Sequence, residues 1–231
     1  MDKDLEETRA LLKKYGQEHL LNHYEKLDDA KKKELLKQIS EIDFQLVEHL
    51  YETTKGTENK HHVEDITPMP YLDKYKLGEE YKYYESIGKK AIKEGKLAAV
   101  TMAGGQGTRL GYDGPKGTYD IGLESHKSLF ELLCDNLKEE GKKYGVIIPW
   151  FIMTSRENNK DTIEFFEKHK YFGYQKDKNI FFFIQGELPM IDTEGKILIG
   201  EDGLIKLAAD GHGGIYESLV KSKMTEKMRQ M

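Results

Sequence analysis

The sequence predicts an α/β protein with a mostly parallel sheet flanked by helices and a helical subdomain at its N-terminus. From residue 96 onward, short apolar runs alternate with amphipathic segments, an order typical of strand–helix–strand units. Before that point the apolar residues recur at helical spacings. We therefore divide the 231 residues into a helical subdomain (1–53), a linker with a leading helix (54–95) and a sheet-containing part (96–231).

The helical subdomain is predicted from leucines and isoleucines spaced three and four residues apart between charges. Its polar residues form no chemical pattern, so we expect it to act in packing. The leading helix is expected to end at Gly95, a plausible C-terminal cap, and to cover the sheet with Tyr81, Tyr83 and Tyr84.

The sheet-containing part begins with a buried strand at 96–102. Ser128, followed by Glu131, is a capping-box pattern that opens a helix to about residue 143. Further elements are expected in the following order: a strand at 146–154, a helix at 157–170, a strand at 179–185, a hairpin or two edge strands at 196–199 and 204–207, and a final helix at 215–229.

Composition excludes several classes of protein. The 41 acidic and 36 basic residues give a formal charge of −5, which argues against a nucleic-acid binder held by a broad basic field. The single cysteine, Cys134, excludes an internal disulfide framework and a cysteine-rich zinc site. No apolar stretch is long enough to cross a bilayer. We therefore expect a cytoplasmic protein.

The most informative stretch is the glycine-rich loop at 103–117, directly after the first predicted strand. Gly104, Gly105 and Gly107 allow the backbone to approach a ligand closely. Exposed N–H groups in such a turn form an anion-binding nest, and Arg109 and Lys116 add two cations. Because parallel sheets bind ligands at the carboxyl ends of their strands, this loop predicts a polyphosphate site.

Two familiar phosphate loops do not fit this stretch. A Walker A loop needs a glycine before its lysine, whereas Lys116 follows Pro115. The dinucleotide fingerprint needs a third glycine where Leu110 stands. The loop therefore matches neither motif, and the alternative to a polyphosphate site is a glycine-rich turn with two surface cations.

The stretch 102–116 resembles the signature of the UTP-dependent sugar-1-phosphate uridylyltransferases, the UDP-sugar pyrophosphorylases. Residues 117–130, 182–189 and 209–216, with the helical N-terminus around 16–19, are similar to the UDP-N-acetylhexosamine pyrophosphorylase branch. This resemblance covers nearly the whole chain. It implies a Rossmann-like nucleotidyltransferase core that forms pyrophosphate and a UDP-sugar, UDP-N-acetylglucosamine or UDP-glucose, from UTP and a sugar 1-phosphate.

The same resemblance implies roles for individual residues. Arg109 matches the catalytic arginine on the UTP phosphates, and Lys116 matches the lysine near the α-phosphate. Gln185 matches the residue that holds the uracil edge, and His212 the residue bordering base and sugar. The other nucleotide-binding residues that it implies are Gly104, Gly105, Gln106, Gly107, Thr108 and Gly211.

The chain departs from the family pattern in two ways. His212 stands where the N-acetylhexosamine branch usually has asparagine, which leaves the sugar open. The family's metal-binding aspartate and most of its sugar pocket lie beyond residue 231, so the ligands of the implied Mg²⁺ are unknown. We expect a C-terminally incomplete core whose uncovered sheet edge self-associates or binds a complementing chain.

Two functions therefore stay open: a uridylyltransferase, and a non-catalytic module that binds UTP or a UDP-sugar. A transferase for another base or sugar is a third, and Gln185 with residues 211–214 favours uracil over it through the resemblance alone. Asp210 is expected to position that glycine-rich turn. The expected partners are UTP and a sugar 1-phosphate, with no nucleic acid and no membrane.

Overall fold

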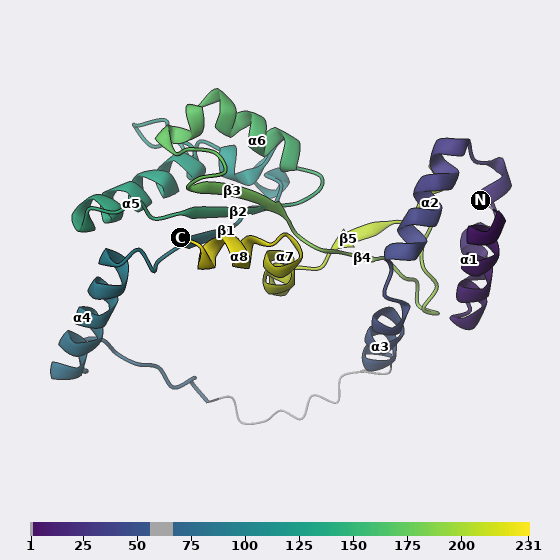
Figure 1. Cartoon of the computed structure of the whole chain (residues 1–231), viewed down its shortest axis with the longest axis horizontal. Coiled ribbons are helices and arrows are strands. Elements are labelled where there is room, and N and C mark those ends of the chain that lie inside the picture. The colour runs from purple at the N-terminus through teal and green to yellow at the C-terminus, as the bar shows by residue number, and fades with distance from the viewer. Residues whose placement is uncertain (1, 56–66) are drawn as a thin grey trace. The chain divides into compact units, whose positions relative to one another are not determined.

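The computed structural model describes residues 2–55 and 67–231, and these fall into two compact units (Figure 1). The first unit joins the described residues up to Thr67 with Glu187–Ala209, and the second joins Pro68–Gly186 with Asp210–Met231. Residues 56–66 of the predicted linker lie outside the described part. None of the described helices is long and apolar enough to cross a membrane.

The first unit begins with the predicted helical region. Asp28 and Asp43 cap the second and third helices, because their carboxylates accept hydrogen bonds from Lys31 N (2.8 Å) and Leu46 N (3.0 Å). The elements are α1 (Asp2–Lys14), two 3₁₀ turns (Glu18–Leu21 and Tyr24–Lys26), α2 (Asp29–Glu41) and α3 (Phe44–Thr54).

The rest of the first unit is an antiparallel ribbon. Strand β4 (Glu187–Pro189) pairs with β5 (Leu207–Ala209), and single antiparallel bridges join Ile191 to Ile197 and Ile199 to Ile205. The predicted hairpin at 196–207 is therefore present, although as isolated bridges rather than continuous strands. Sequence periodicity did not predict β4, which is only three residues long.

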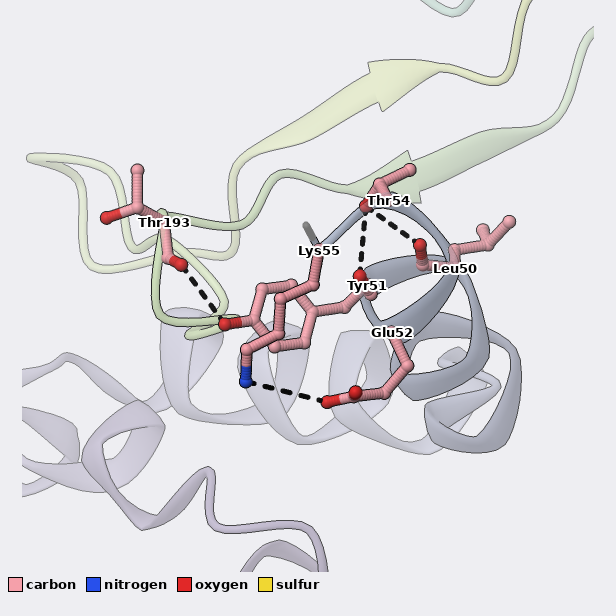
Figure 2. Close-up of polar contacts among 6 residues, drawn as sticks. All are labelled: Leu50, Tyr51, Glu52, Thr54, Lys55 and Thr193. Carbon is pink, nitrogen blue, oxygen red and sulfur yellow. Dashed lines mark hydrogen bonds and ion pairs between the residues drawn. The ribbon is translucent and has the colours of Figure 1, made fainter. Parts of the chain in front are cut away.

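The helices and the ribbon of the first unit share one hydrophobic core. Ile197 and Ile205 of the ribbon are 1% and 4% exposed and pack with buried helix residues such as Leu12 and Leu35. At the end of α3, the Tyr51 hydroxyl donates to the carbonyl of Thr193 at 3.1 Å (Figure 2). Packing thus groups residues 187–209 with the N-terminal helices rather than with 96–231, because burying one isoleucine face of the ribbon requires those helices.

The second unit contains the parallel sheet (Figure 1). Its strands, in the order β1-β2-β3, are β1 (Ala99–Met102), β2 (Trp150–Thr154) and β3 (Ile180–Ile184). Both pairs are parallel, and Ile152 lies between Thr101 and Phe182. The helices are α4 (Glu79–Lys93), α5 (Leu129–Tyr144), α6 (Asn159–Lys168), α7 (Ile215–Lys221) and α8 (Met224–Arg229). The predicted α/β class is confirmed.

Helices cover both faces of this sheet (Figure 1). On one face Trp150 and Ile152 pack with Phe130 of α5 and Phe166 of α6, all at most 1% exposed. On the other face the core consists of Phe151, Met153, Phe181, Phe183 and Leu219 of α7, with Met224 and Met228 of α8 against it. Every β2 residue is buried, as expected for the central strand of a covered parallel sheet.

Three expectations for this unit are wrong. The first predicted strand is not buried, because β1 is an edge strand that pairs only with β2 among the described residues and none of its residues is buried. The final helix is broken, because Lys223 has a left-handed backbone (φ 60°) between α7 and α8. Tyr81, Tyr83 and Tyr84 of α4 do not cover the sheet and are 38%, 62% and 56% exposed. The physical reason is that α5–α6 and α7–α8 already occupy the two sheet faces, so α4 buries none of its residues.

Candidate functional site

The glycine-rich loop folds back on itself after β1. Gly107 N donates to Gly114 O at 2.8 Å, and Lys116 N donates to Gly105 O at 3.0 Å, with an antiparallel bridge between Gln106 and Pro115. These bonds bring Lys116 beside the start of the loop, where a Cβ on Gly105 would lie 3.7 Å from the Lys116 Nζ. The loop thus holds an ammonium group directly over its exposed backbone.

Gln185 reaches the same loop from the end of β3. Its backbone N donates to Thr154 O at 2.8 Å, which continues the pairing of β3 with β2. Its side-chain amide lies so close to Gly104 that a Cβ there would be 2.5 Å from Oε1. Gly104 is therefore required by space, and the three nearest atoms to a Cβ there all belong to the Gln185 amide, which can both donate and accept.

Asn158 anchors the start of the glycine-rich loop through its side-chain amide. It was not identified from the sequence. It is fully buried, and its amide nitrogen donates to Ala103 O at 3.0 Å and to Gly105 O at 3.4 Å. Its Oδ1 accepts from Ser155 N at 2.9 Å, so the side chain is fixed from both ends. The signal that could have found it is its position just after the central strand, on the edge where ligands bind.

A second shape constraint holds the far end of the loop. A Cβ on Gly117 would lie 2.2 Å from the ring of Phe130, which is 1% exposed. The Tyr112 hydroxyl lies 2.8 Å from Thr118 Oγ1, which in turn donates to Pro115 O at 2.8 Å. The residues after Lys116 are therefore fastened to α5 and to the loop itself.

Four of the other predicted site residues lie on exposed turns. Thr108 and Arg109 are on a 3₁₀ turn (Thr108–Leu110), and Gly211 and His212 are on the turn that precedes α7. Gln106 is half-buried, and its Oε1 has no hydrogen-bond partner among the described residues. The structure thus joins Gly104 to Gln185 and Gly105 to Lys116, while Arg109 and His212 face solvent.

Asp120 shapes the segment that leaves the loop. Its carboxylate accepts from Gly122 N at 2.8 Å and lies 3.1 Å from His126 Nδ1. The backbone hydrogen bond from Gly122, followed by the one from His126, lowers the pKa of Asp120 below its ordinary value. Within the described residues, no three His, Cys, Asp or Glu side chains come together as a metal site.

Comparison with protein families matches residues 42–231 to the model described as UTP–glucose-1-phosphate uridylyltransferase. The chain belongs to this family. The family match includes the whole glycine-rich loop, Gln185 and the 211–214 turn, so the candidate site lies inside the matched region.

Individual relatives agree with this assignment. The chain is 33% identical to a probable UDP-N-acetylglucosamine pyrophosphorylase of Schizosaccharomyces pombe, over 99% of this chain and 50% of that protein. It is 35% identical to the UDP-N-acetylglucosamine pyrophosphorylase of Saccharomyces cerevisiae, over 95% of this chain and 49% of that protein. The chain spans about half the length of these relatives.

A solved structure also agrees. The uridine diphosphate N-acetylglucosamine pyrophosphorylase of Trypanosoma brucei, determined with an inhibitor, matches with a TM-score of 0.70 and 28% identity. The match covers 94% of this chain and 45% of that chain. The α/β fold predicted from the sequence is therefore the fold of this part of the family.

Proposed function

We propose that this chain binds UTP in the loop after β1 and takes part in uridylyl transfer to a sugar 1-phosphate. The observation that carries the proposal is the pair of contacts at the loop's start, Gln185 on Gly104 and Lys116 on Gly105. A uracil edge needs a group that donates and accepts, and a triphosphate needs cations and backbone N–H groups. Gln185 and Lys116 lie against neighbouring glycines at one edge of the parallel sheet, which supports both assignments.

The reaction requires positioning more than acid–base chemistry. An oxygen of the sugar 1-phosphate attacks the α-phosphorus of UTP, and the bond from that phosphorus to the bridging oxygen breaks. Pyrophosphate leaves with the electron pair. Because the attacking group is already an anion, the reaction needs no general base. Lys116 and Arg109 would stabilise the charge that spreads over the α-phosphate and the departing pyrophosphate.

Magnesium would neutralise phosphate charge when bound, as it does in related chemistry. It prefers phosphate oxygens with one or two carboxylates. The described residues bring no three His, Cys, Asp or Glu side chains together, so they do not form a metal site by themselves. The roles proposed here therefore rest on the chain's own amide, cations and backbone.

The names of the relatives favour one sugar. The Saccharomyces cerevisiae relative is named a UDP-N-acetylglucosamine pyrophosphorylase and the Schizosaccharomyces pombe relative a probable one, which supports N-acetylglucosamine 1-phosphate as the second substrate. Glucose 1-phosphate is the competing choice, since the family model is described by that substrate. Parallel assays with the two sugar phosphates distinguish these choices.

The test of the proposal is calorimetric titration with UTP, with and without Mg²⁺, using ATP and GTP as controls. We expect UTP-selective binding that weakens at least about tenfold in Arg109→Ala, because a charge-assisted contact to phosphate is lost. Arg229→Ala, which removes an exposed arginine of α8 in the same unit, should leave the affinity unchanged. Equal binding of all three nucleotides, or of none, would contradict the proposal.

A second candidate is a UTP- or UDP-sugar-binding module without turnover. The lack of a carboxylate cluster among the described residues favours it. Pyrophosphate release from UTP and N-acetylglucosamine 1-phosphate separates the two functions. Binding with release supports the transferase, and binding without release supports the module.

We also propose that the outer edge of β1 binds a second copy of the chain. In the described residues β1 pairs only with β2, and Val100 and Met102 are 37% and 47% exposed. Their register partners Phe151 and Met153 on β2 are fully buried. The helices that cover this face of the sheet, α7 and α8, therefore cover β2 but leave β1 exposed. An open edge beside apolar side chains is a template for strand pairing.

Light scattering across protein concentrations tests this edge. We expect a concentration-dependent dimer in the native chain and about tenfold weaker association in Val100→Lys, since a charged edge disfavours pairing. A monomer at every concentration would contradict self-association and would favour a complementing chain of different sequence.

A further inference from the structure

Asp210 occupies an unusually tight space between two glycines. A Cβ on Gly214 would lie 2.1 Å from the Asp210 Oδ2, and a Cβ on Gly186 would lie 2.2 Å from the same atom. Gly214 has ordinary helical angles (φ −64°, ψ −7°), and Gly186 is not among the residues with positive φ. Backbone conformation therefore does not require glycine at position 186 or 214. The Asp210 carboxylate requires it, because it occupies the space of a Cβ at both positions.

The same residue ties two parts of the second unit together. Asp210 N donates to Gly186 O at 3.1 Å, and Gly186 N donates to Ser218 Oγ at 3.0 Å. Ser218 belongs to α7 and is 4% exposed. The residue after Gln185 is thus held between Asp210 and α7, and Gly211 and His212 follow Asp210 directly.

The carboxylate itself is incompletely paired. Its Oδ1 is buried and has no hydrogen-bond partner among the described residues. An unpaired buried oxygen costs stability, and proteins retain such groups where another role depends on them. Filling the gap between Gly186 and Gly214 is such a role, because it fixes the separation of the two backbone segments.

We propose that Asp210 is a positioning residue that locks the 211–214 turn against the end of β3 and so fixes His212 relative to Gln185. It acts by its shape, through the two glycines, and not by touching the nucleotide. The effect on nucleotide affinity rests on the proposed function, whereas the locking of the turn does not depend on it.

The first experiment measures the turn without any ligand. The amides of Gly186 and Gly214 are hydrogen-bonded, to Ser218 Oγ and to Gly211 O, so their exchange with solvent reports on the lock. By NMR we expect exchange at both amides to rise at least about tenfold in Asp210→Ala and less than about threefold in Asp210→Asn, which keeps the shape. Unchanged exchange in Asp210→Ala, or equal loss in both variants, would overturn the proposal.

A matched control comes from the first unit. Asp202 also sits in a glycine-flanked turn, where a Cβ on Gly200 would lie 2.6 Å from its Oδ1, and this oxygen accepts from Leu204 N at 3.1 Å. Asp202→Ala should leave exchange at Gly186 and Gly214 unchanged. If it raises exchange there as much as Asp210→Ala does, the effect is general loosening and the proposal fails.

The second experiment measures UTP affinity by titration. Asp210→Ala should weaken binding about tenfold and Asp210→Asn less than threefold. Gly214→Ala should weaken binding by itself, because the new methyl group displaces the carboxylate, but should add little in the Asp210→Ala background. Additive effects of the two changes would show that Gly214 does not act through Asp210 and would overturn the proposal.

The two readouts separate the two ideas. If the native chain binds no UTP, the proposed function fails, while amide exchange still decides whether Asp210 locks the turn. If Asp210→Ala raises exchange but leaves UTP affinity unchanged, the lock is purely structural and the positioning role is overturned.

Discussion

Two buried glutamines, one in each unit, show how the same side chain serves different ends. Gln17 and Gln185 are 7% and 8% exposed. The Gln17 amide donates to Gly195 O at 2.8 Å and accepts from Ile197 N at 3.0 Å. The Gln185 amide makes no hydrogen bond within the described residues and lies instead against Gly104.

The comparison shows that the two side-chain amides use their hydrogen-bonding groups for different purposes. Gln17 uses both polar atoms to hold the ribbon to the helices, so its role is structural. Gln185 keeps its donors and acceptor available at the edge where the glycine-rich loop begins. The Gln185 amide is not among the buried groups left without a partner in the described residues, so water can reach it and a ligand can take the place of that water.

The largest expected effect is on stability, from Gln17→Leu. This change leaves the carbonyl of Gly195 and the buried N–H of Ile197 without partners, and we expect the free energy of unfolding to fall by about 3 kcal/mol. Urea denaturation followed by circular dichroism measures it. Gln45→Leu, at an exposed position in the same unit, should change it by less than about 0.5 kcal/mol. If Gln17→Leu and Gln45→Leu have the same free energy of unfolding, the structural role assigned to Gln17 is wrong.

Gln185→Leu should show the reverse pattern. We expect UTP affinity to fall about 100-fold, equivalent to about 2.7 kcal/mol, because the uracil edge loses its partner. The free energy of unfolding should stay within about 0.5 kcal/mol of the native value, since no protein hydrogen bond is lost. The exposed Gln175→Leu is the control. If Gln185→Leu destabilises the chain as much as Gln17→Leu does, Gln185 has a structural role like that of Gln17 and the prediction is wrong.

A smaller effect concerns how the stability of the chain depends on pH, because the Cys134 thiol is buried in the aromatic core. Burial raises the pKa of the Cys134 thiol from 9.0 to about 11. The unfolded chain therefore loses this proton first as pH rises, so stability is full below pH 9 and falls between pH 9 and 11. We expect a loss of about 2 kcal/mol by pH 11 that Cys134→Ala does not share.

Denaturation curves of the native chain and Cys134→Ala at pH 8 and 11 measure this difference. Burial, and to a smaller extent the charge of Cys134, raise the pKa of Tyr174 to about 12, so only the part due to burial is common to the two proteins. Parallel pH profiles for the two proteins would mean that water reaches Cys134 and that the core is less closed than its packing indicates.

The fold of the second unit could be predicted because its signals are local. The alternation of apolar runs and amphipathic segments predicted the three parallel strands, and Ser128 marked the start of α5, where it accepts from Glu131 N at 3.2 Å. The final helix was mispredicted because nothing in its periodicity marks the left-handed turn at Lys223.

The residues of the candidate site were predicted unevenly. The glycines, Arg109 and Lys116 form a contiguous pattern after a strand, and their assignment as nucleotide-binding residues stays a prediction. Asn158 lies more than fifty residues from the carbonyls of Ala103 and Gly105 that it holds. No local pattern reveals such a contact, because it depends on two neighbouring strands ending at the same edge.

The sequence by itself determined the class of fold, the glycine-rich loop and the family, since these depend on residue type and spacing along the chain. Only the tertiary structure decided that residues 187–209 pack with the N-terminal helices, that Gln185 faces Gly104 and that Asp210 fills the gap between Gly186 and Gly214. These contacts join residues distant in sequence, and their energies come from shape and hydrogen bonds that exist only when both partners are in place.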